Sequence, residues 1–209
     1  MSYRDFKFPD VLSQLRLGFG TALLFTDVFG VALRPDVMEQ LREAIPLVTR
    51  TDTEKSRSEF LVAPILFEVW RMTGKSFGLF SGVTFNVEPE KGLKGVCDFL
   101  LTRDPKAIIV QSPFMAVVEA KNDKTRNGFG QCIASMAAVD QFNSKHEVNE
   151  PVYGVVTTGL AWRFLKIDHD RSISTDVVTL DDAEYLLLQD VDKIAGILLS
   201  IVAPHKGIL

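Results

Sequence analysis

The run of residues 114–121, Phe-Met-Ala-Val-Val-Glu-Ala-Lys, constrains the fold of this chain most strongly. Successive side chains of a strand point to opposite faces, so Glu119 and Lys121 share one face while Val118 and Ala120 share the other. A strand that is otherwise suited to burial therefore ends with two opposite charges on one side. Because an unpaired buried charge costs several kcal/mol, the sequence predicts a partner or a functional role for this strand end.

A second apolar run supplies a candidate partner. Residues 95–102, Gly-Val-Cys-Asp-Phe-Leu-Leu-Thr, contain a carboxylate at Asp98. Neighbouring strands of a sheet lie about 4.8 Å apart, so carboxylates on two adjacent strands can meet. We expect Asp98 and Glu119 to do so.

The composition favours one globular domain. The chain has 209 residues, of which 46% are hydrophobic and 24% charged, and its formal net charge is -4. We expect a single domain over residues 1–209, with residues 1–50 forming a helical or irregular extension packed on it. The negative charge argues against a surface coated with basic residues for non-specific binding to nucleic acid or membranes.

The compartment is also predicted from the sequence. The N-terminal residues lack the apolar segment of a signal peptide, and no uncharged apolar run reaches the roughly 18 residues of a membrane span. Two cysteines, Cys97 and Cys132, lie in apolar segments and are too few for a disulfide framework. We therefore expect a cytoplasmic protein with no membrane segment.

The hydrophobic periodicity predicts a mixed α/β fold of the α+β type. We expect helices over residues 35–46, 53–73 with a kink at Pro64, 128–143 and 189–202. We expect strands over residues 79–87, 95–102 and 115–121 in an antiparallel meander, then over 152–157 and 162–167. Shorter extended pieces are expected at residues 107–110 and within 177–188.

Four segments carry the unusual polar residues. They are Ser58-Glu59-Phe-Leu, Gly95-Val-Cys-Asp98-Phe, Val118-Glu119-Ala-Lys121 and Gly130-Gln131-Cys-Ile-Ala. In this order, the four segments resemble those of the PD-(D/E)XK nuclease superfamily, over residues 53–167. The resemblance, which extends to small stand-alone members, implies a restriction-endonuclease-like fold with a mixed central sheet flanked by helices. Cys97 stands where the family name has Pro, a position at which many members also lack Pro.

The residue types suit phosphodiester cleavage. Carboxylate oxygens of Asp98 and Glu119, with the carbonyl of Ala120, are ligands that Mg²⁺ prefers, and Mn²⁺ is a natural substitute. Lys121 is placed to orient a water molecule or to neutralise phosphate charge. The resemblance further implies that Glu59 is a supporting or second-metal carboxylate, and that Gln131 supports Lys121 or the phosphate by hydrogen bonding.

Each of these residues also has an ordinary structural interpretation. Glu59 could be a carboxylate favoured by a helix start, and Gln131 a polar residue of a first helical turn. Glu68 is an alternative to Glu59, although we expect it to meet solvent. We expect Asp123 to be a loop residue.

The expected substrate is DNA. Lys91, Lys94, Lys124 and Arg126 lie in predicted loops beside the motif strands, and Arg163 and Lys166 lie in a neighbouring strand. They would contact the phosphate backbone or, alternatively, serve only as solubilising charges. A homodimer would suit the cutting of two strands, and a partner protein could supply targeting. The competing hypothesis is a non-catalytic binding or assembly module of the same fold, acting with a partner protein.

Overall fold

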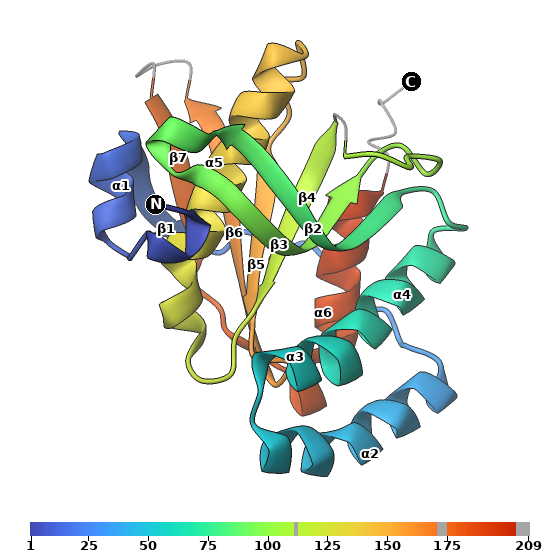
Figure 1. The fold of residues 1–209 in the computed structure, drawn as a ribbon. Helices are drawn as coiled ribbons and strands as arrows, with labels where there is room; N and C mark the ends of the chain where they lie inside the picture. The colour runs from blue at the N-terminus through green and yellow to red at the C-terminus, as the bar shows by residue number, and fades with distance from the viewer. Residues whose placement is uncertain (111–112, 171–174, 204–209) are drawn as a thin grey trace.

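A computed structural model describes residues 1–110, 113–170 and 175–203, which form a mixed α/β fold around one sheet (Figure 1). Among these residues the sheet has eight strands in the order β1-β7-β6-β5-β4-β3-β2, with β8 paired to β6. The strands are β1 (Gly18–Ala22), β2 (Gly78–Glu88), β3 (Leu93–Thr102), β4 (Phe114–Ala120), β5 (Val152–Thr157), β6 (Ala161–Asp170), β7 (Thr175–Asp181) and β8 (Tyr185–Leu186).

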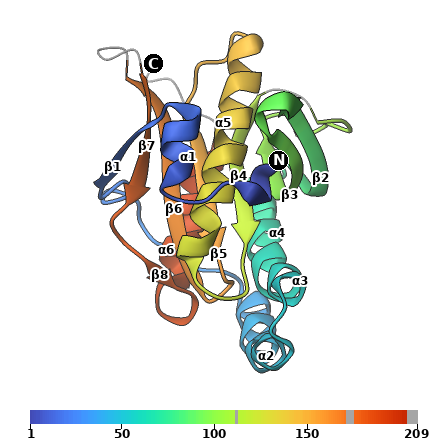
Figure 2. The same cartoon turned by 60° about the vertical axis from the view of Figure 1, so that its left-hand side comes forward.

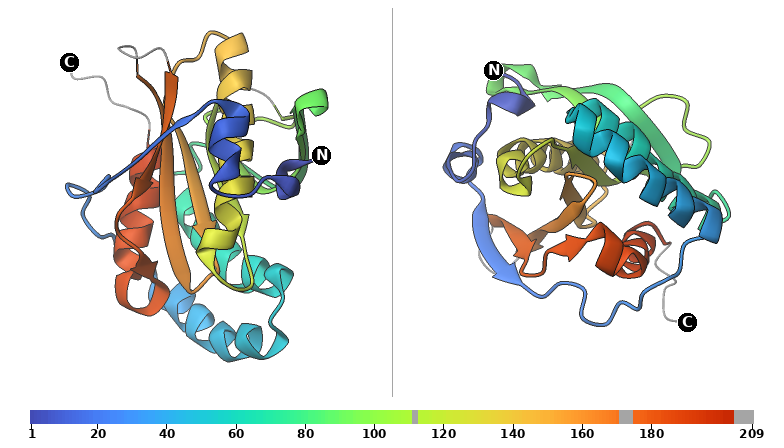
Figure 3. Two further views of the ribbon diagram at one scale, coloured as in Figure 1. Left: turned by 90° about the vertical axis from the view of Figure 1, so that its left-hand side faces the viewer. Right: turned by 90° about the horizontal axis from the view of Figure 1, so that it is seen from below.

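Helices cover both faces of the sheet (Figures 2 and 3). The short α1 (Asp10–Leu15) and the long α5 (Phe129–Lys145) pack on one face, where they share a core with inward-facing residues of the strands. The other face carries α2 (Pro35–Thr51), α4 (Ala63–Met72) and α6 (Leu187–Val202), around a second core. Because both faces are covered, β4 is buried along its whole length.

The predicted meander is confirmed. Strands β2, β3 and β4 pair antiparallel, and β4 then pairs parallel with β5 through the crossover helix α5. A parallel pair needs such a crossover, since a tight turn can join only antiparallel strands. The sheet is therefore mixed, as the resemblance implies.

The N-terminal segment is more regular than expected. A short 3-10 turn, η1 (Tyr3–Asp5), and α1 precede β1, which pairs parallel with β7 at the sheet edge. The extension thus supplies a strand of the sheet. Helix α2 also continues through Pro46 to Thr51, where the sequence predicted an end near Pro46. One lost backbone hydrogen bond is outweighed by continued burial, since Val48 beyond the proline is fully buried.

The predicted helix over residues 53–73 is interrupted. It consists of α3 (Glu54–Arg57), a π-helical turn called η2 (Ser58–Val62), and α4. The irregular turn lies immediately before Pro64, which cannot donate a backbone hydrogen bond. The expected strand at residues 107–110 is wrong, because these residues form bends and irregular structure.

Strands and helices near the C-terminus follow the sequence pattern closely. β5 spans the predicted residues, and the extended piece within 177–188 resolves into β7 and β8. In the described part of the chain, no helix combines the length and apolar character needed to span a membrane.

Candidate functional site

The ladder between β3 and β4 ends close to the predicted site. Its last pair toward that end is Phe99 with Val118, whereas β4 stays paired with β5 through Ala120. Asp98 occupies the point of separation, where one carboxylate oxygen accepts a hydrogen bond of 2.8 Å from the backbone N–H of Ala120. The two strands are therefore bridged by a carboxylate where their backbone pairing stops.

Glu119 lies beneath this point on the side of α5. Its side chain is 0% exposed. Gln131 donates a hydrogen bond of 2.6 Å to one carboxylate oxygen, and Ser135 donates one of 3.3 Å to the other. Gln131 and Ser135 are four residues apart, so they lie on the same face of α5.

The environment of Glu119 favours its protonated form. Burial, followed by the negative charge of Asp98, raises the pKa of Glu119 to about 8, against partial opposition from Lys121 and Arg4. The negative charge of Asp98 therefore disfavours ionisation of Glu119. A cation placed between them would lower the pKa again.

Lys121 projects to the same side of β4 as Glu119. Its carbon stem lies beside Gly128, at the entrance to α5, and its ammonium group donates to the carbonyl of Ala120 at 2.9 Å. The same nitrogen lies 3.8 Å from a carboxylate oxygen of Glu54. Lys121 is therefore held at the strand end by one hydrogen bond and one ion pair.

A cavity of about 300 Å³ opens at this point. Its charged lining comes from η1, from the α3–η2 segment and from β3, and consists of Arg4, Glu54, Lys55, Glu59 and Asp98. Ala120 contributes to the lining, whereas Glu119 does not and is fully buried. The cavity therefore unites charged residues from distant parts of the chain.

Glu59 reaches the rim of this cavity from the π-helical turn. Its side chain is 52% exposed and pairs with Lys55 at 2.7 Å. The π-helical turn adds a residue to the helical winding just before α4, and such turns recur at functional sites. Glu59 and Asp98 thus face one cavity, although Glu59 stays in contact with solvent.

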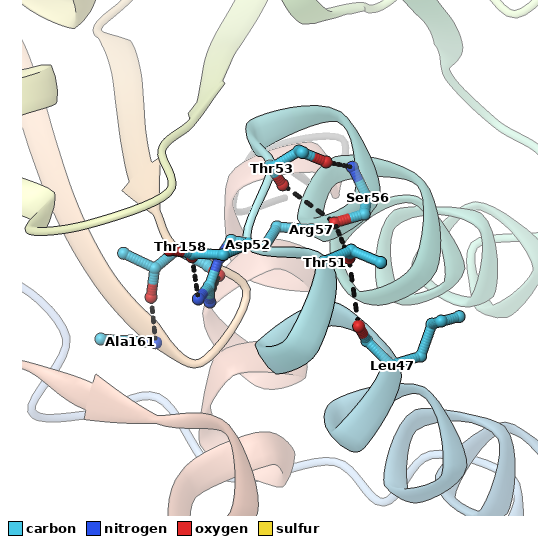
Figure 4. Close-up of polar contacts among 8 residues, drawn as sticks. All are labelled: Leu47, Thr51, Asp52, Thr53, Ser56, Arg57, Thr158 and Ala161. Atoms are coloured by element: carbon cyan, nitrogen blue, oxygen red, sulfur yellow. Dashed lines mark hydrogen bonds and ion pairs between the residues drawn. The ribbon is translucent and has the colours of Figure 1, made fainter.

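A polar network fixes the α2–α3 corner against the sheet (Figure 4). Arg57 donates a hydrogen bond of 3.1 Å to the carbonyl of Thr158, in the β5–β6 turn. It also pairs with Asp52 at 3.1 Å. The side chain of Thr53 caps α3 by accepting from the backbone N–H of Ser56. These contacts set the position of α3, and therefore of Glu54, beside the end of β4.

The predicted site residues have mixed fates. The end of β4 brings together Asp98, Glu119, Lys121 and Gln131. Gln131 donates its hydrogen bond to Glu119, whereas the resemblance implied Lys121 or a phosphate as its partner. Glu68 was expected in solvent, and this is wrong.

Glu68 is in fact 2% exposed and pairs with Arg34 at 3.2 Å and with Arg71 at 2.7 Å. Its position on α4 turns it toward these two arginines and into the protein. Asp123 is a loop residue, as expected, and accepts a hydrogen bond from Asn127.

None of the four residues predicted to contact nucleic acid lines the cavity at the end of β4, among the residues that the structure describes. Lys91 pairs with Glu88 at 2.9 Å, Lys94 is half-buried, and Lys124 is exposed. Arg126 lies over the ring of Phe8, 6.0 Å from its centroid.

Three residues of the site were missed by sequence reasoning. Ser135 could have been found from its four-residue spacing to Gln131. The sequence signal at Glu54 is only that of an acidic residue in a first helical turn after a Thr cap, which is an ordinary helix start. Arg4 carries no sequence signal, because its place depends on how the N-terminal segment folds back.

The oxygen donors at the end of β4 are of the types that bind a hard divalent cation. Among residues 1–110, 113–170 and 175–203, no group of three or more His, Cys, Asp or Glu side chains is arranged to hold a metal. Mg²⁺, however, is usually held by one or two carboxylates with water and substrate phosphate. Asp98, Glu119 and the carbonyl of Ala120 are donors of this type, but Glu119 is fully buried with both oxygens hydrogen-bonded, and the Ala120 carbonyl accepts from Lys121.

Comparison with known proteins finds no family model and no curated protein sequence that matches this chain.

Proposed function

We propose that this protein is a metal-dependent nuclease of the PD-(D/E)XK type that hydrolyses phosphodiester bonds in DNA. The observation that carries the proposal is that Asp98 accepts from the N–H of Ala120 and Lys121 donates to its carbonyl, beside the buried Glu119, where β3 and β4 separate. Two carboxylates, a backbone carbonyl and an ammonium group at one strand end are the groups that such a reaction needs.

The proposal includes a restriction-endonuclease-like fold. The chain runs α4-β2-β3-β4-α5-β5, with an antiparallel meander followed by a parallel strand. This order resembles the core of the restriction-endonuclease-like fold. The candidate residues fall on β3, on β4 and on the helix after them, as that resemblance implies.

Each side chain has a distinct role in this proposal. Asp98, Glu119 and the Ala120 carbonyl would hold Mg²⁺, with Glu59 a further carboxylate across the cavity. When bound, the cation would make a bound water more acidic and polarise a phosphoryl oxygen. Gln131 keeps the Glu119 carboxylate oriented, and Lys121 donates to the attacking water or to a phosphate oxygen.

A plasmid-nicking assay tests the proposal. Purified protein with Mg²⁺ or Mn²⁺ is expected to nick supercoiled DNA, whereas the variants Glu119→Ala and Lys121→Ala are expected to lose this activity. The loop variant Asp123→Ala serves as the control and should keep it. Cleavage by both site variants at the wild-type rate would overturn the assignment.

A second candidate function is favoured by one feature of the site. Glu119 is fully buried with both oxygens hydrogen-bonded, and Lys121 is drawn toward Glu54. This arrangement also suits a non-catalytic binding or assembly module, acting as a dimer or with a partner protein. Titration with Mn²⁺ separates the two functions, because only the nuclease should bind the ion in a manner that Asp98→Ala abolishes.

A further inference from the structure

A second pocket lies beside the start of α5 and shares no lining residue with the site cavity. Its volume is about 260 Å³. It is formed between the N-terminal segment, the loop after β4 and the strands β6 and β7, and its lining residues include Phe8, Phe19, Thr125, Arg126, Phe129 and Arg163.

Three phenylalanines form its apolar wall. The rings of Phe8 and Phe19 lie 5.2 Å apart, and Phe129 meets Phe8 edge-on at 5.8 Å. Phe19 lies in the edge strand β1, and 39% of its surface is exposed. An aromatic cluster that is open to solvent on one side offers a stacking surface for another flat ring.

Two arginines stand over this wall. The guanidinium carbon of Arg163 lies 5.8 Å from the centroid of Phe129, and that of Arg126 lies 6.0 Å from the centroid of Phe8. One end of Arg163 donates to the backbone carbonyl of Asp181. Its Nε is buried and has no hydrogen-bond partner among the described residues. A buried donor without an acceptor is rare in folded proteins and calls for an explanation.

The charge around the pocket favours an anion. The described lining residues include these two arginines and no carboxylate. Two nearby carboxylates do not line the pocket: the buried Asp181 accepts from Tyr185 and from the backbone of Leu24, and Glu184 accepts from the lining residue Thr125. Arginine suits phosphate because its planar group can donate two parallel hydrogen bonds.

We propose that this pocket binds a nucleotide, with the base against Phe8 and Phe19 and the phosphate held by Arg126 and Arg163. The proposal does not depend on the nuclease function. The nucleotide could be free or could be the phosphorylated end of a nucleic-acid strand, since both present a base and a terminal phosphate.

The sheet register brings the pocket close to the candidate site. Arg163 pairs with Val156, which pairs with Glu119 on the next strand. Two spacings between neighbouring β-strands amount to about 10 Å. A single-stranded nucleic acid can cover this distance. A strand end bound in this pocket could therefore extend toward the end of β4.

Calorimetric titration in the presence of a metal chelator tests the proposal without any cleavage. The probes are thymidine monophosphate, thymidine, and a short oligothymidine with either a 5′-phosphate or a 5′-hydroxyl. Thymidine monophosphate is expected to bind at least about tenfold more tightly than thymidine, because only the former provides an acceptor for charge-assisted hydrogen bonds. If the phosphorylated oligothymidine binds more tightly than both the mononucleotide and the hydroxyl oligothymidine, the ligand is the end of a nucleic-acid strand. If the mononucleotide and the phosphorylated oligothymidine bind equally, the ligand is a free nucleotide.

Two variants at exposed positions assign the binding to this pocket. Arg126→Ala and Phe19→Ala should each weaken binding of thymidine monophosphate by about tenfold or more, through loss of a phosphate contact and of a stacking surface. Arg42→Ala, at an exposed position of α2, is the matched control and should bind like the wild type. Absence of binding to every probe, or unchanged binding by Arg126→Ala and Phe19→Ala, would overturn the proposal.

Discussion

Gln131 donates a hydrogen bond of 2.6 Å to the fully buried carboxylate of Glu119. The bond joins α5 to β4 across 12 positions of the chain. Hydrogen bonding of this kind stabilises the charged form of a carboxyl group. Gln131 therefore lets a buried carboxylate ionise more readily than burial alone would allow.

Replacing Gln131 by Met should raise the pKa of Glu119 above its value of about 8, since a donor to the charged form is lost. The pH at which the carboxyl carbon of Glu119 titrates, followed by NMR in metal-free protein, measures the change. Gln14→Met, at an exposed position of α1, should leave the titration unaltered. An unchanged midpoint in Gln131→Met would show that this bond does not support ionisation.

The stability of the metal-free protein should depend on Glu119 in a definite direction. Its pKa rises from 4.5 to about 8 on folding, so its contribution is fully present below about pH 4.5 and is lost as the pH rises through 8. Relative to Glu119→Gln, the wild type should lose at most about 1.4 kcal/mol of unfolding free energy per pH unit over this window.

Urea unfolding of wild type and Glu119→Gln from pH 5 to pH 8 provides the measurement. The exposed Glu59→Gln variant is the control, and its stability difference from the wild type should not show this trend. A wild-type minus Glu119→Gln difference that stays constant across the window would mean that Glu119 ionises as in the unfolded chain.

The buried Glu68 should matter more when it is left without partners than when it is removed. In the double variant Arg34→Met/Arg71→Met its carboxylate stays buried and unpaired, and we expect a loss of about 3–5 kcal/mol of unfolding free energy. Glu68→Met should cost less, because both arginines are partly exposed and can turn toward water.

Urea unfolding at neutral pH ranks these variants. The control pair Arg42→Met/Arg50→Met, at exposed positions of α2, should be close to the wild type. If Glu68→Met proves as destabilising as the double arginine variant, the carboxylate must contribute chiefly through packing.

Gly196 should not tolerate a side chain. A β-carbon at this position of α6 would overlap the backbone carbonyl of Phe29, in the segment that crosses the helix. Gly196→Ala should therefore cost about 1–3 kcal/mol of unfolding free energy. Gly20→Ala is a fair control, since no described atom lies within 4 Å of its added carbon, and thermal unfolding compares the two. Equal melting temperatures would show that the crossing segment can move away freely.

The local patterns in the sequence were sufficient for much of the fold. Alternation with period 2 located β2 to β6, and helical periodicity located α5 and α6, because burial of one face imposes these periods directly. Local patterns failed where long-range packing outweighed propensity. β1 forms because β7 offers it an edge, and α2 runs past Pro46 because Val48 is buried beyond it.

That Glu119 and Lys121 share a face at the end of a buried strand follows from their spacing, since two residues two apart in a strand must do so. The residues that surround them depend on tertiary packing. It brought Asp98 to the N–H of Ala120, Gln131 and Ser135 to Glu119, and Arg4 and Glu54 to the same cavity. These neighbours are distant in the chain, and their positions follow from how the layers pack, which no local spacing encodes.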